Sequence, residues 1–431
     1  MAISRRQLLR AGVAGGLGWA WCGAVERAAA AMVARTRAAV APVVAGDTVL
    51  VVVELFGGND GLNTVVPLRQ FARYRALRPT IAIPRQRLLP LPGLEQDFAF
   101  NPGMESLARL YRRGRVAVIP GVACPPDAQG LFDHEASTQN FLTGTTYGSA
   151  PPATPSGWLG RFLDGVAPAA LPAGVSFSNA PLLLTGVTST PLSLYALSGF
   201  GVYPTDDFEA RYDAYRRLQQ AAAPPGVAER NRQLREQVLT LSGDLQAISD
   251  GYAVTDGVSY PNSNLANALR DCAALIAARR GVRALDVSLS GFDTHADEQG
   301  GPPDTAAYHE ALWRDVSDSI AAFQADIEGH GLGGKVLTLV LSEFGRRPVE
   351  NNDLGTDHGF SGPMFAIGAP VRAGVWSDYP DLRDESLVLD GNLDRSVDFR
   401  AVFATVLERH LGADPTSILG GEFGRVGFLG G

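Results

Sequence analysis

Apolar runs alternate with longer amphipathic stretches along this chain, and the alternation predicts strands and helices. Short runs rich in β-branched residues, each ended by glycine or a polar residue, predict strands at 48–56, 116–119, 284–289 and 336–341. Apolar positions at helical spacing predict helices at 104–113, 263–279, 305–328 and 398–411. Two shorter runs, "GPMFAIG" and "GVWSD", predict later edge strands.

The succession of strands and helices predicts the fold class. Buried strands separated by long helices indicate an α/β domain over 46–431, with a mostly parallel central sheet flanked by helices on both faces. Such sheets bind ligands at the carboxyl ends of their strands, so functional groups are expected there. Residues 151–260 differ, being rich in Pro, Gly, Ser and Thr before a charged helical pattern. We interpret them as an insertion or cap over the active face.

Composition and charge narrow the function classes. The 431 residues are 45% hydrophobic and 19% charged, with 49 glycines and 28 prolines, which is typical of a globular chain with many loops. The net charge of -8, with no basic stripe, argues against nucleic-acid binding.

The N-terminus carries the pattern of an export signal. Arg5 and Arg6 precede an apolar stretch of about 15 residues and the small residues 28–31, as in twin-arginine signals. We expect a signal over 1–31, with cleavage near Ala31 or as late as Ala45, and an N-terminal anchor helix is the alternative. The apolar run is too short for a stable membrane span. The predicted partner is the twin-arginine export machinery, and the predicted location is the periplasm or another exported site.

Cysteine usage leaves one question open. Cys22 lies in the predicted signal, so only Cys124 and Cys272 remain in the mature chain. They either form a disulfide, which an oxidising compartment permits, or are two free buried thiols. The absence of a CxxC pair argues against a cysteine zinc site.

Two polar clusters follow predicted strands in "GGNDGLN" and "GFDTHADEQ". Asp60 follows the first strand, although an Asn-Asp-Gly turn alone would explain it. Asp293 and His295 lie two residues apart, so in an extended segment they project to the same side. They are candidate metal ligands. Asp293 could instead orient His295 as a general base, or the two could form an ordinary loop hydrogen bond.

Two further clusters are "SEFGRR" and "NNDLGTDHGFSGPMF". Glu343 leaves a strongly apolar strand, so its carboxylate needs a metal or an arginine as partner. Arg346 could bind an anionic group as a planar fork, or could pair with Glu343 to close a turn. His358 follows an aspartate and precedes a predicted strand, where a polar turn is the alternative.

The histidines divide into two groups. His309, His330 and His410 lie in or at the ends of predicted helices, where we expect surface or capping roles. The others have acidic neighbours, and His134 stands in the polar run "LFDHEASTQNFLTG". No cluster is decisive alone, but their coincidence at strand ends predicts one shared polar site.

The segments "ELFGGNDGLN", "GFDTHADEQ", "LSEFGRR", "GTDHGFSGPMF" and "DFRAVFATVLERHLGA" resemble the bacterial exported family catalogued as domain of unknown function 1501. That family is similar to the alkaline phosphatase and sulfatase superfamily. The resemblance implies an alkaline phosphatase-like fold with two divalent metals, Zn, Mn or Ca, at the carboxyl ends of the strands. The implied metal ligands are Asp60, Asp293, His295, Glu343 and His358.

Two departures from the superfamily pattern concern catalysis. Phe344 stands where the superfamily has a metal-binding histidine. In sulfatases a modified Cys or Ser begins an 11-residue run ending in Thr-Gly, and counting back from Gly144 puts His134 at that position. Ser137 or Thr138 could serve as nucleophile, but at a different offset.

Three functions are compatible with this pattern. The first is an exported metal-dependent hydrolase of phosphate or sulfate esters, with an anionic small molecule or envelope component as substrate. There Arg346 would grip the anion, and His134 would be a ligand, a general acid/base or a nucleophile. The second is a non-catalytic periplasmic binding or assembly protein that retains the fold. The third is an esterase using His134, which the absence of a G-x-S-x-G motif disfavours.

Overall fold

The computed structural model describes residues 46–146, 155–178, 181–197, 240–300 and 308–430. The predicted export signal and the charged helical pattern within 198–239 lie outside the described residues. None of the described helices is long and apolar enough to cross a membrane.

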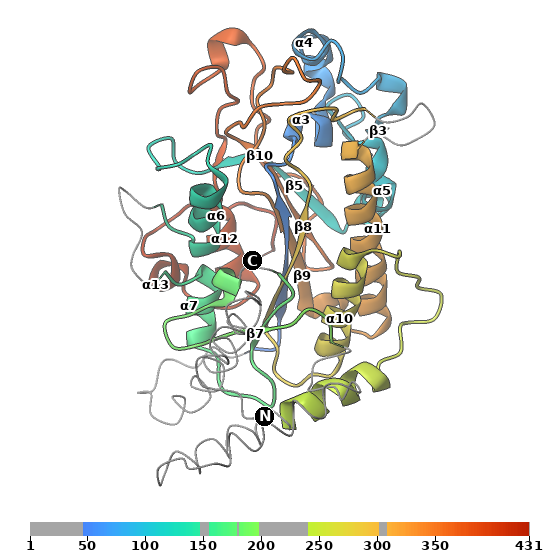
Figure 1. Ribbon diagram of the computed structural model, residues 1–431, viewed down its shortest axis with the longest axis vertical. Helices are drawn as coiled ribbons and strands as arrows, with labels where there is room; N and C mark the ends of the chain where they lie inside the picture. The colour runs from blue at the N-terminus through green and yellow to red at the C-terminus, as the bar shows by residue number, and fades with distance from the viewer. Residues whose placement is uncertain (1–45, 147–154, 179–180, 198–239, 301–307, 431) are drawn as a thin grey trace, which may run out of the picture.

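A nine-stranded sheet forms the centre of the described chain (Figure 1), in the order β11-β5-β10-β9-β1-β8-β6-β7 with β12 also paired to β5. Its long strands are β1 (Val49–Phe56), β5 (Val116–Ala123), β8 (Ala284–Ser290), β9 (Val336–Leu341) and β10 (Gly362–Ile367). Its short strands are β6 (Gly174–Ser176), β7 (Leu192–Ser193), β11 (Gly374–Val375) and β12 (Val397–Asp398). Only β10 among these strands is antiparallel to its neighbours, which confirms the predicted α/β class.

The position of β10 corrects one prediction. We expected "GPMFAIG" at an edge, but β10 lies between β5 and β9 and its residues from Met364 to Ile367 are buried. A continuous apolar run is typical of a strand covered on both faces. The prediction for "GVWSD" is confirmed, because it provides the edge strand β11.

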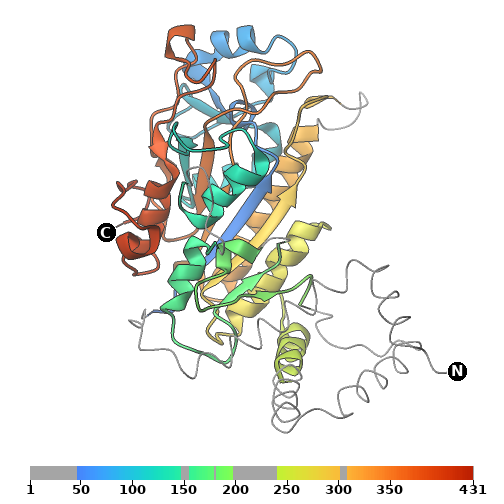
Figure 2. The same cartoon turned by 60° about the vertical axis from the view of Figure 1, so that its left-hand side comes forward.

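Alternation along β1 separates two hydrophobic cores, one on each face of the sheet. Val51 and Val53 belong to the core formed with α5 (Glu105–Arg112), α10 (Asn264–Ala277) and α11 (Tyr308–Gly329). Leu50 and Val52 belong to the core formed with α6 (His134–Thr143), α7 (Trp158–Asp164), α12 (Phe399–Arg409) and α13 (Pro415–Leu419). Figure 2 shows helices on both sides of the sheet, as predicted.

The buried cysteines belong to different cores. Cys124 lies in the core with α12, whereas Cys272 lies in the core with α11. Both are free thiols, so the disulfide alternative is excluded.

Part of the predicted insertion belongs to the main sheet. Within 151–260, β6 pairs with β8 and β7 pairs with β6, both in parallel. The described part of this segment therefore widens the sheet. That residues 151–260 cover the active face stays a prediction.

A small sheet lies beyond the carboxyl end of β1, at the top of Figure 1. It has the order β2-β4-β3, and it packs with the short helices α3 and α4 around its own apolar cluster. The bounds are β2 (Val65–Pro67), β3 (Leu89–Pro90), β4 (Phe98–Phe100), α3 (Gly61–Thr64) and α4 (Phe71–Leu77). Arg78 is the residue that directly follows α4 in this small sheet-and-helix unit.

Aromatic packing under α12 gives a stability prediction. Phe403 is fully buried, stacks on Trp158 with ring centroids 4.5 Å apart, and meets Phe399 edge to face at 5.3 Å. Because Phe403→Ala leaves a cavity between these rings, we expect a loss of about 3–5 kcal/mol in the free energy of unfolding, measured with urea. Tyr195→Ala, at a side chain that is 92% exposed, should leave it nearly unchanged. A Phe403 variant as stable as the Tyr195 variant would contradict the packing argument.

Candidate metal centre

The loops that follow β1, β8 and β9 meet at the carboxyl end of the sheet, because these three neighbouring strands run parallel. Gly57 has φ +125°, and a Cβ there would lie 2.1 Å from the backbone nitrogen of Asp293. The loops after β1 and β8 are therefore in direct backbone contact, which only glycine permits at this position.

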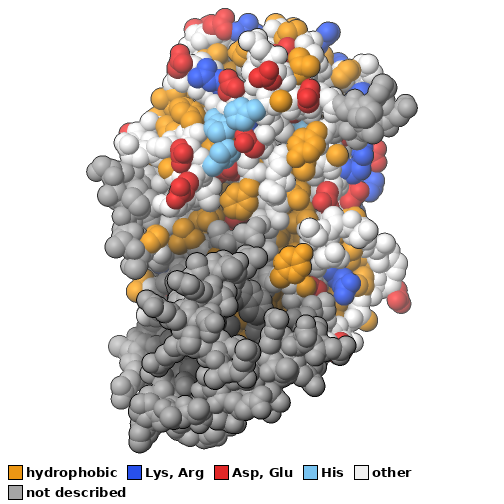
Figure 3. All heavy atoms as spheres, in the orientation of Figure 1, with side chains coloured by type: hydrophobic (Ala, Val, Ile, Leu, Met, Phe, Trp, Pro, Cys, Tyr) orange, Lys and Arg blue, Asp and Glu red, His pale blue; other side chains and the backbone are white. Residues whose placement is uncertain are grey.

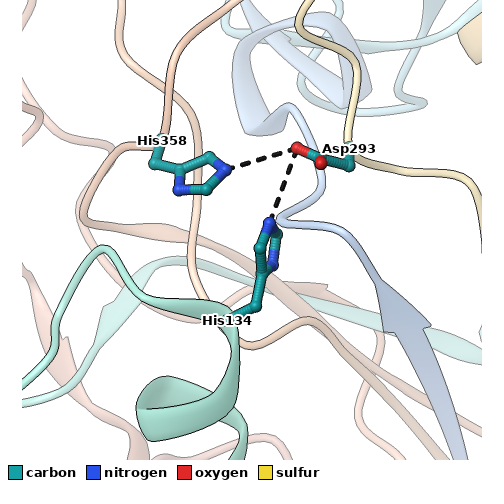
Figure 4. A group of neighbouring side chains, drawn as sticks. All are labelled: His134, Asp293 and His358. Atoms are coloured by element: carbon teal, nitrogen blue, oxygen red, sulfur yellow. Dashed lines mark hydrogen bonds and ion pairs between the residues drawn. The ribbon is translucent and has the colours of Figure 1, made fainter.

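Three side chains converge at this edge (Figure 4). His134, Asp293 and His358 each offer one potential metal-ligand atom, and these atoms lie within 4.8 Å of one another. His134 begins α6, Asp293 follows β8, and His358 precedes β10. The side chains are 38%, 49% and 23% exposed, and the histidines form a group on the molecular surface (Figure 3). The centre is therefore accessible to a ligand from solvent.

His134 is held in one orientation by its helix and by Glu343. Asp133 caps α6 by accepting from Ala136 N, which fixes His134 at the first helical position. His134 Nδ1 lies 2.8 Å from Glu343 Oε1 and donates to that carboxylate. The hydrogen bond raises the pKa of His134. Its Nε2 is buried and has no hydrogen-bond partner among the described residues, at 3.6 Å from Asp293 Oδ1.

His358 has the same arrangement. Its Nδ1 lies 2.7 Å from Phe132 O, and because a carbonyl can only accept, Nδ1 carries the proton. In the neutral ring Nε2 then has the lone pair, 3.3 Å from Asp293 Oδ1, whereas in the protonated ring Nε2 donates to that oxygen. Burial lowers the pKa of His358, which favours the neutral imidazole that binds metals.

Glu343 lies behind His134 and outside the three-ligand group. Its side chain is 3% exposed, and Oε1 accepts from both Gly57 N and His134 Nδ1. Oε2 accepts from Ser342 Oγ at 3.0 Å. We expected Glu343 to be a ligand, but in the structure it accepts a hydrogen bond from His134 and lies outside the group of three.

Arg346 also has a different role from the one expected. Its side chain is fully buried. It donates to Gly58 O at 2.7 Å, to Thr356 O at 2.8 Å, to Gly57 O and to Asp293 Oδ1. These bonds occupy the guanidinium group, so it presents no face to an anionic substrate. Burial opposes ionisation of Asp293, but Arg346 outweighs it and lowers the pKa of that carboxyl group.

Comparison with models of protein families assigns the chain to one family. The model of the family described as "Protein of unknown function (DUF1501)" matches residues 47–427. The chain belongs to this family. No curated protein matches it.

Among solved structures, this DUF1501 protein is similar to the C-terminal periplasmic domain of EcEptC from Escherichia coli in complex with Zn. The identity is 9%, over 89% of this chain and 90% of that chain, with a TM-score of 0.39. A protein in the alkaline phosphatase superfamily from Vibrio parahaemolyticus gives 9% identity, 89% and 71% coverage, and a TM-score of 0.38. The lipoteichoic acid synthase LtaP from Listeria monocytogenes gives 8%, 75% and 65%, with a TM-score of 0.33. This chain thus spans less than two thirds of the length of LtaP.

His295 lies beside the three-ligand group of the DUF1501 protein without belonging to it. Its Nε2 is 3.1 Å from Asp293 Oδ1, and its Nδ1 is 3.5 Å from Asp357 Oδ1. The side chain is 44% exposed. The group of three does not include His295. Of the three roles considered from sequence, this leaves a histidine oriented by Asp293 or an ordinary loop hydrogen bond.

Asp60, which we predicted as a ligand, lies outside the group of three. It is fully buried, and its two carboxylate oxygens bind Nη1 and Nη2 of Arg78 in a bidentate pair. Burial alone would raise the pKa of Asp60, but Arg78 overrides this effect and lowers it to about 2. Both oxygens are engaged in the ion pair, so Asp60 is not available to the group at Asp293.

Residues that sequence analysis missed lie around this ion pair. Arg78 had no signal, because it follows an ordinary helical pattern. Glu298 stood in the quoted cluster "GFDTHADEQ", yet a buried carboxyl group resembles an exposed one in sequence. His309 was expected on the surface or at a cap, but it is fully buried, with Nε2 3.1 Å from Asn59 Oδ1. Burial lowers the pKa of His309 to about 4.

Phe344 fills the space beside the two histidine ligands. Its ring centroid lies 4.9 Å from that of His134 and 4.8 Å from that of His358. Ser137, one of the nucleophile candidates, is buried and donates to Gly130 O. Thr138, the other candidate, lines a small cavity beside Glu54. Neither hydroxyl group belongs to the three-ligand group.

The buried Asp60–Arg78 pair gives a stability prediction. Asp60→Asn leaves Arg78 buried with an incomplete partner, so we expect a loss of about 3–5 kcal/mol in the free energy of unfolding. Because the folded pKa of Asp60 is depressed, its stabilisation is present above the unfolded pKa of about 3.9 and is lost as the pH falls towards about 2. Asp60→Asn should reduce this acid dependence in urea unfolding at pH 2–7. Asp384→Asn, in an exposed pair with Arg73, is the control and should change little.

Proposed function

We propose that this protein is an exported metal-dependent hydrolase of phosphate or sulfate esters, with a single divalent ion held by His134, Asp293 and His358. The observation that supports it is the Nε2 atom of His134. This atom is buried, makes no hydrogen bond to a described residue, and lies 3.6 Å from Asp293 Oδ1 within the group of three. A buried polar atom without a partner is costly unless it has a ligand.

The donor set fits a transition metal. Two imidazoles and a carboxylate suit Zn or Mn better than Ca, which prefers oxygen ligands alone. Glu343 and the carbonyl of Phe132 each accept from the second ring nitrogen of a histidine ligand. Such partners fix the tautomer that binds metal. Phe344 packs against both imidazoles, which supports one metal ion rather than the two of the superfamily.

When bound, the ion would polarise the ester or lower the pKa of a water molecule. The residues supply orientation and proton transfer. His295 Nε2 lies 3.1 Å from Asp293 Oδ1 and is oriented by this contact. The other ring nitrogen, Nδ1, would then exchange a proton with substrate or solvent. Asp357 lies 3.5 Å from Nδ1 and would stabilise the protonated ring. His295 is therefore our candidate general acid or base.

Export is part of the proposal and rests on the sequence. Arg5 and Arg6 with the following apolar run support passage through the twin-arginine machinery. The substrate would then be an anionic small molecule or a component of the cell envelope.

A second candidate function is a non-catalytic binding or assembly protein of the envelope. The bonds of Arg346 favour it, because the one arginine predicted to bind an anion is buried and occupied.

Metal content separates the two candidates. After reconstitution with zinc or manganese, we expect the wild-type protein to retain about one ion per chain and to hydrolyse aryl phosphate, phosphodiester or sulfate substrates. His134→Ala and His358→Ala should lose the ion, as elemental analysis would show. His330→Ala, which alters a histidine bonded to Ala253 O and outside the three-ligand group, should retain it. A wild-type protein with neither metal nor turnover would favour the binding-protein function.

The role of His295 has its own test. Because His295 would transfer protons without binding the ion, His295→Ala should lower kcat by about 10²–10⁴-fold and leave the metal content unchanged. Loss of metal in this variant would instead make His295 a ligand. Unchanged kcat with full metal content would remove it from the mechanism.

A further inference from the structure

Two of the three ligands come from loops rather than from helices or strands. Asp293 lies in the loop 291–298 after β8, and His358 lies in the loop 351–358 before β10. The sheet fixes where each loop begins or ends, but it does not fix the distance between them. Something else must hold Asp293 and His358 in register.

The loops are joined first by their backbones. Three hydrogen bonds of 3.0 Å cross between them, from Thr356 N to Thr294 O, from Asp297 N to Asp353 O and from Glu298 N to Leu354 O. The contact is close, because a Cβ on Gly355 would lie 2.3 Å from the carbonyl carbon of His295.

The side chain of Glu298 makes a second connection at the same place. It is fully buried, and its Oε2 lies 3.0 Å from Thr294 Oγ1 and 3.1 Å from Thr356 Oγ1. Its Oε1 accepts from Asn63 Nδ2 at 2.7 Å, which ties both loops to α3. Thr294 stands between Asp293 and His295 in the chain, and Thr356 stands two residues before His358.

We propose that Glu298 is a positioning residue of this centre, in addition to Arg346: its buried carboxyl group joins the two ligand loops and thereby helps to set the geometry in which Asp293 and His358 bind the metal ion. The inference rests on the metal site of the proposed function. Glu298 is not part of the three-ligand group, so it acts through the residues that it holds.

Removing the side chain would strand its partners. Two threonine hydroxyl groups and the Asn63 amide would lose a shared buried partner, and each unsatisfied group favours rearrangement of the loop that carries it. Loss of an outer-shell partner typically weakens metal binding by about 10- to 100-fold.

The most conservative replacement is Glu298→Gln. Burial, reinforced by nearby Asp60, raises the pKa of Glu298 to about 8, so its carboxyl group is mainly neutral near pH 7. A glutamine amide has the same shape and is also neutral. Its oxygen can accept from Asn63, and its N–H groups can donate to the threonine hydroxyl groups.

The experiment measures zinc affinity by competition with a chelator, and ligand geometry by the visible absorption of the cobalt-substituted protein, at pH 7. We expect zinc binding about 10- to 100-fold weaker in Glu298→Ala than in wild type, with an altered cobalt spectrum. Glu298→Gln should restore both. Thr356→Val removes a single hydroxyl group and should weaken binding by about 2- to 10-fold, which keeps the test available if Glu298→Ala does not fold.

A matched control comes from another buried carboxylate. Asp326 is fully buried and accepts from Tyr252 Oη, Tyr260 Oη and Thr255 N, none of which belongs to the two ligand loops. Asp326→Ala should lower stability yet leave zinc affinity unchanged. Equal losses of affinity in the Glu298 and Asp326 variants, or wild-type affinity in Glu298→Ala and Thr356→Val, would overturn the inference. Failure of the wild-type protein to bind zinc would instead overturn the proposed function with it.

Discussion

The buried guanidinium group of Arg346 connects three loops of the candidate centre, those after β1, after β8 and before β10. Its hydrogen bonds reach the carbonyls of Gly57 and Gly58 after β1, of Phe292 after β8 and of Thr356 before β10, as well as the carboxylate of Asp293. A buried charge without such partners would be costly, so these loops are stable only in the arrangement that surrounds it. The position of Asp293 depends on that requirement, because its carboxylate is one of the partners.

Besides the Arg346–Asp293 pair, the protein contains a second ion pair, between Asp60 and Arg78, whose side chains are both fully buried. Asp60 and Arg78 fix the short helices α3 and α4 against the carboxyl end of β1, and the Nη2 of Arg78 also donates to Arg347 O. Arg78 and Arg346 are therefore buried, whereas His134, His295 and His358 of the candidate centre stay partly exposed. Positive charge is used for architecture, while the groups that can bind a metal or move a proton remain accessible.

Sequence patterns predicted the fold class, the four long parallel strands and the meeting of polar clusters at one edge, because apolar periodicity and the topology of parallel sheets determine these features. They identified His134, Asp293 and His358 as candidates. They did not separate the ligands from Glu343, Arg346 and Asp60, since a carboxylate or guanidinium group at a strand end has the same appearance in sequence whether it faces a cavity or a backbone carbonyl. Arg78 and Glu298 were missed because their burial depends on contacts with distant segments.

The single reversed strand has a topological consequence. In a sheet of parallel strands, each strand can contribute to the active edge only with residues that follow it. Because β10 runs the other way between β5 and β9, its amino end lies at that same edge. Glu343 follows the end of β9 and His358 precedes the start of β10, so both residues lie at the same end of the sheet. One hairpin-like excursion of about 20 residues therefore supplies a ligand, the orienting acceptor and the central arginine.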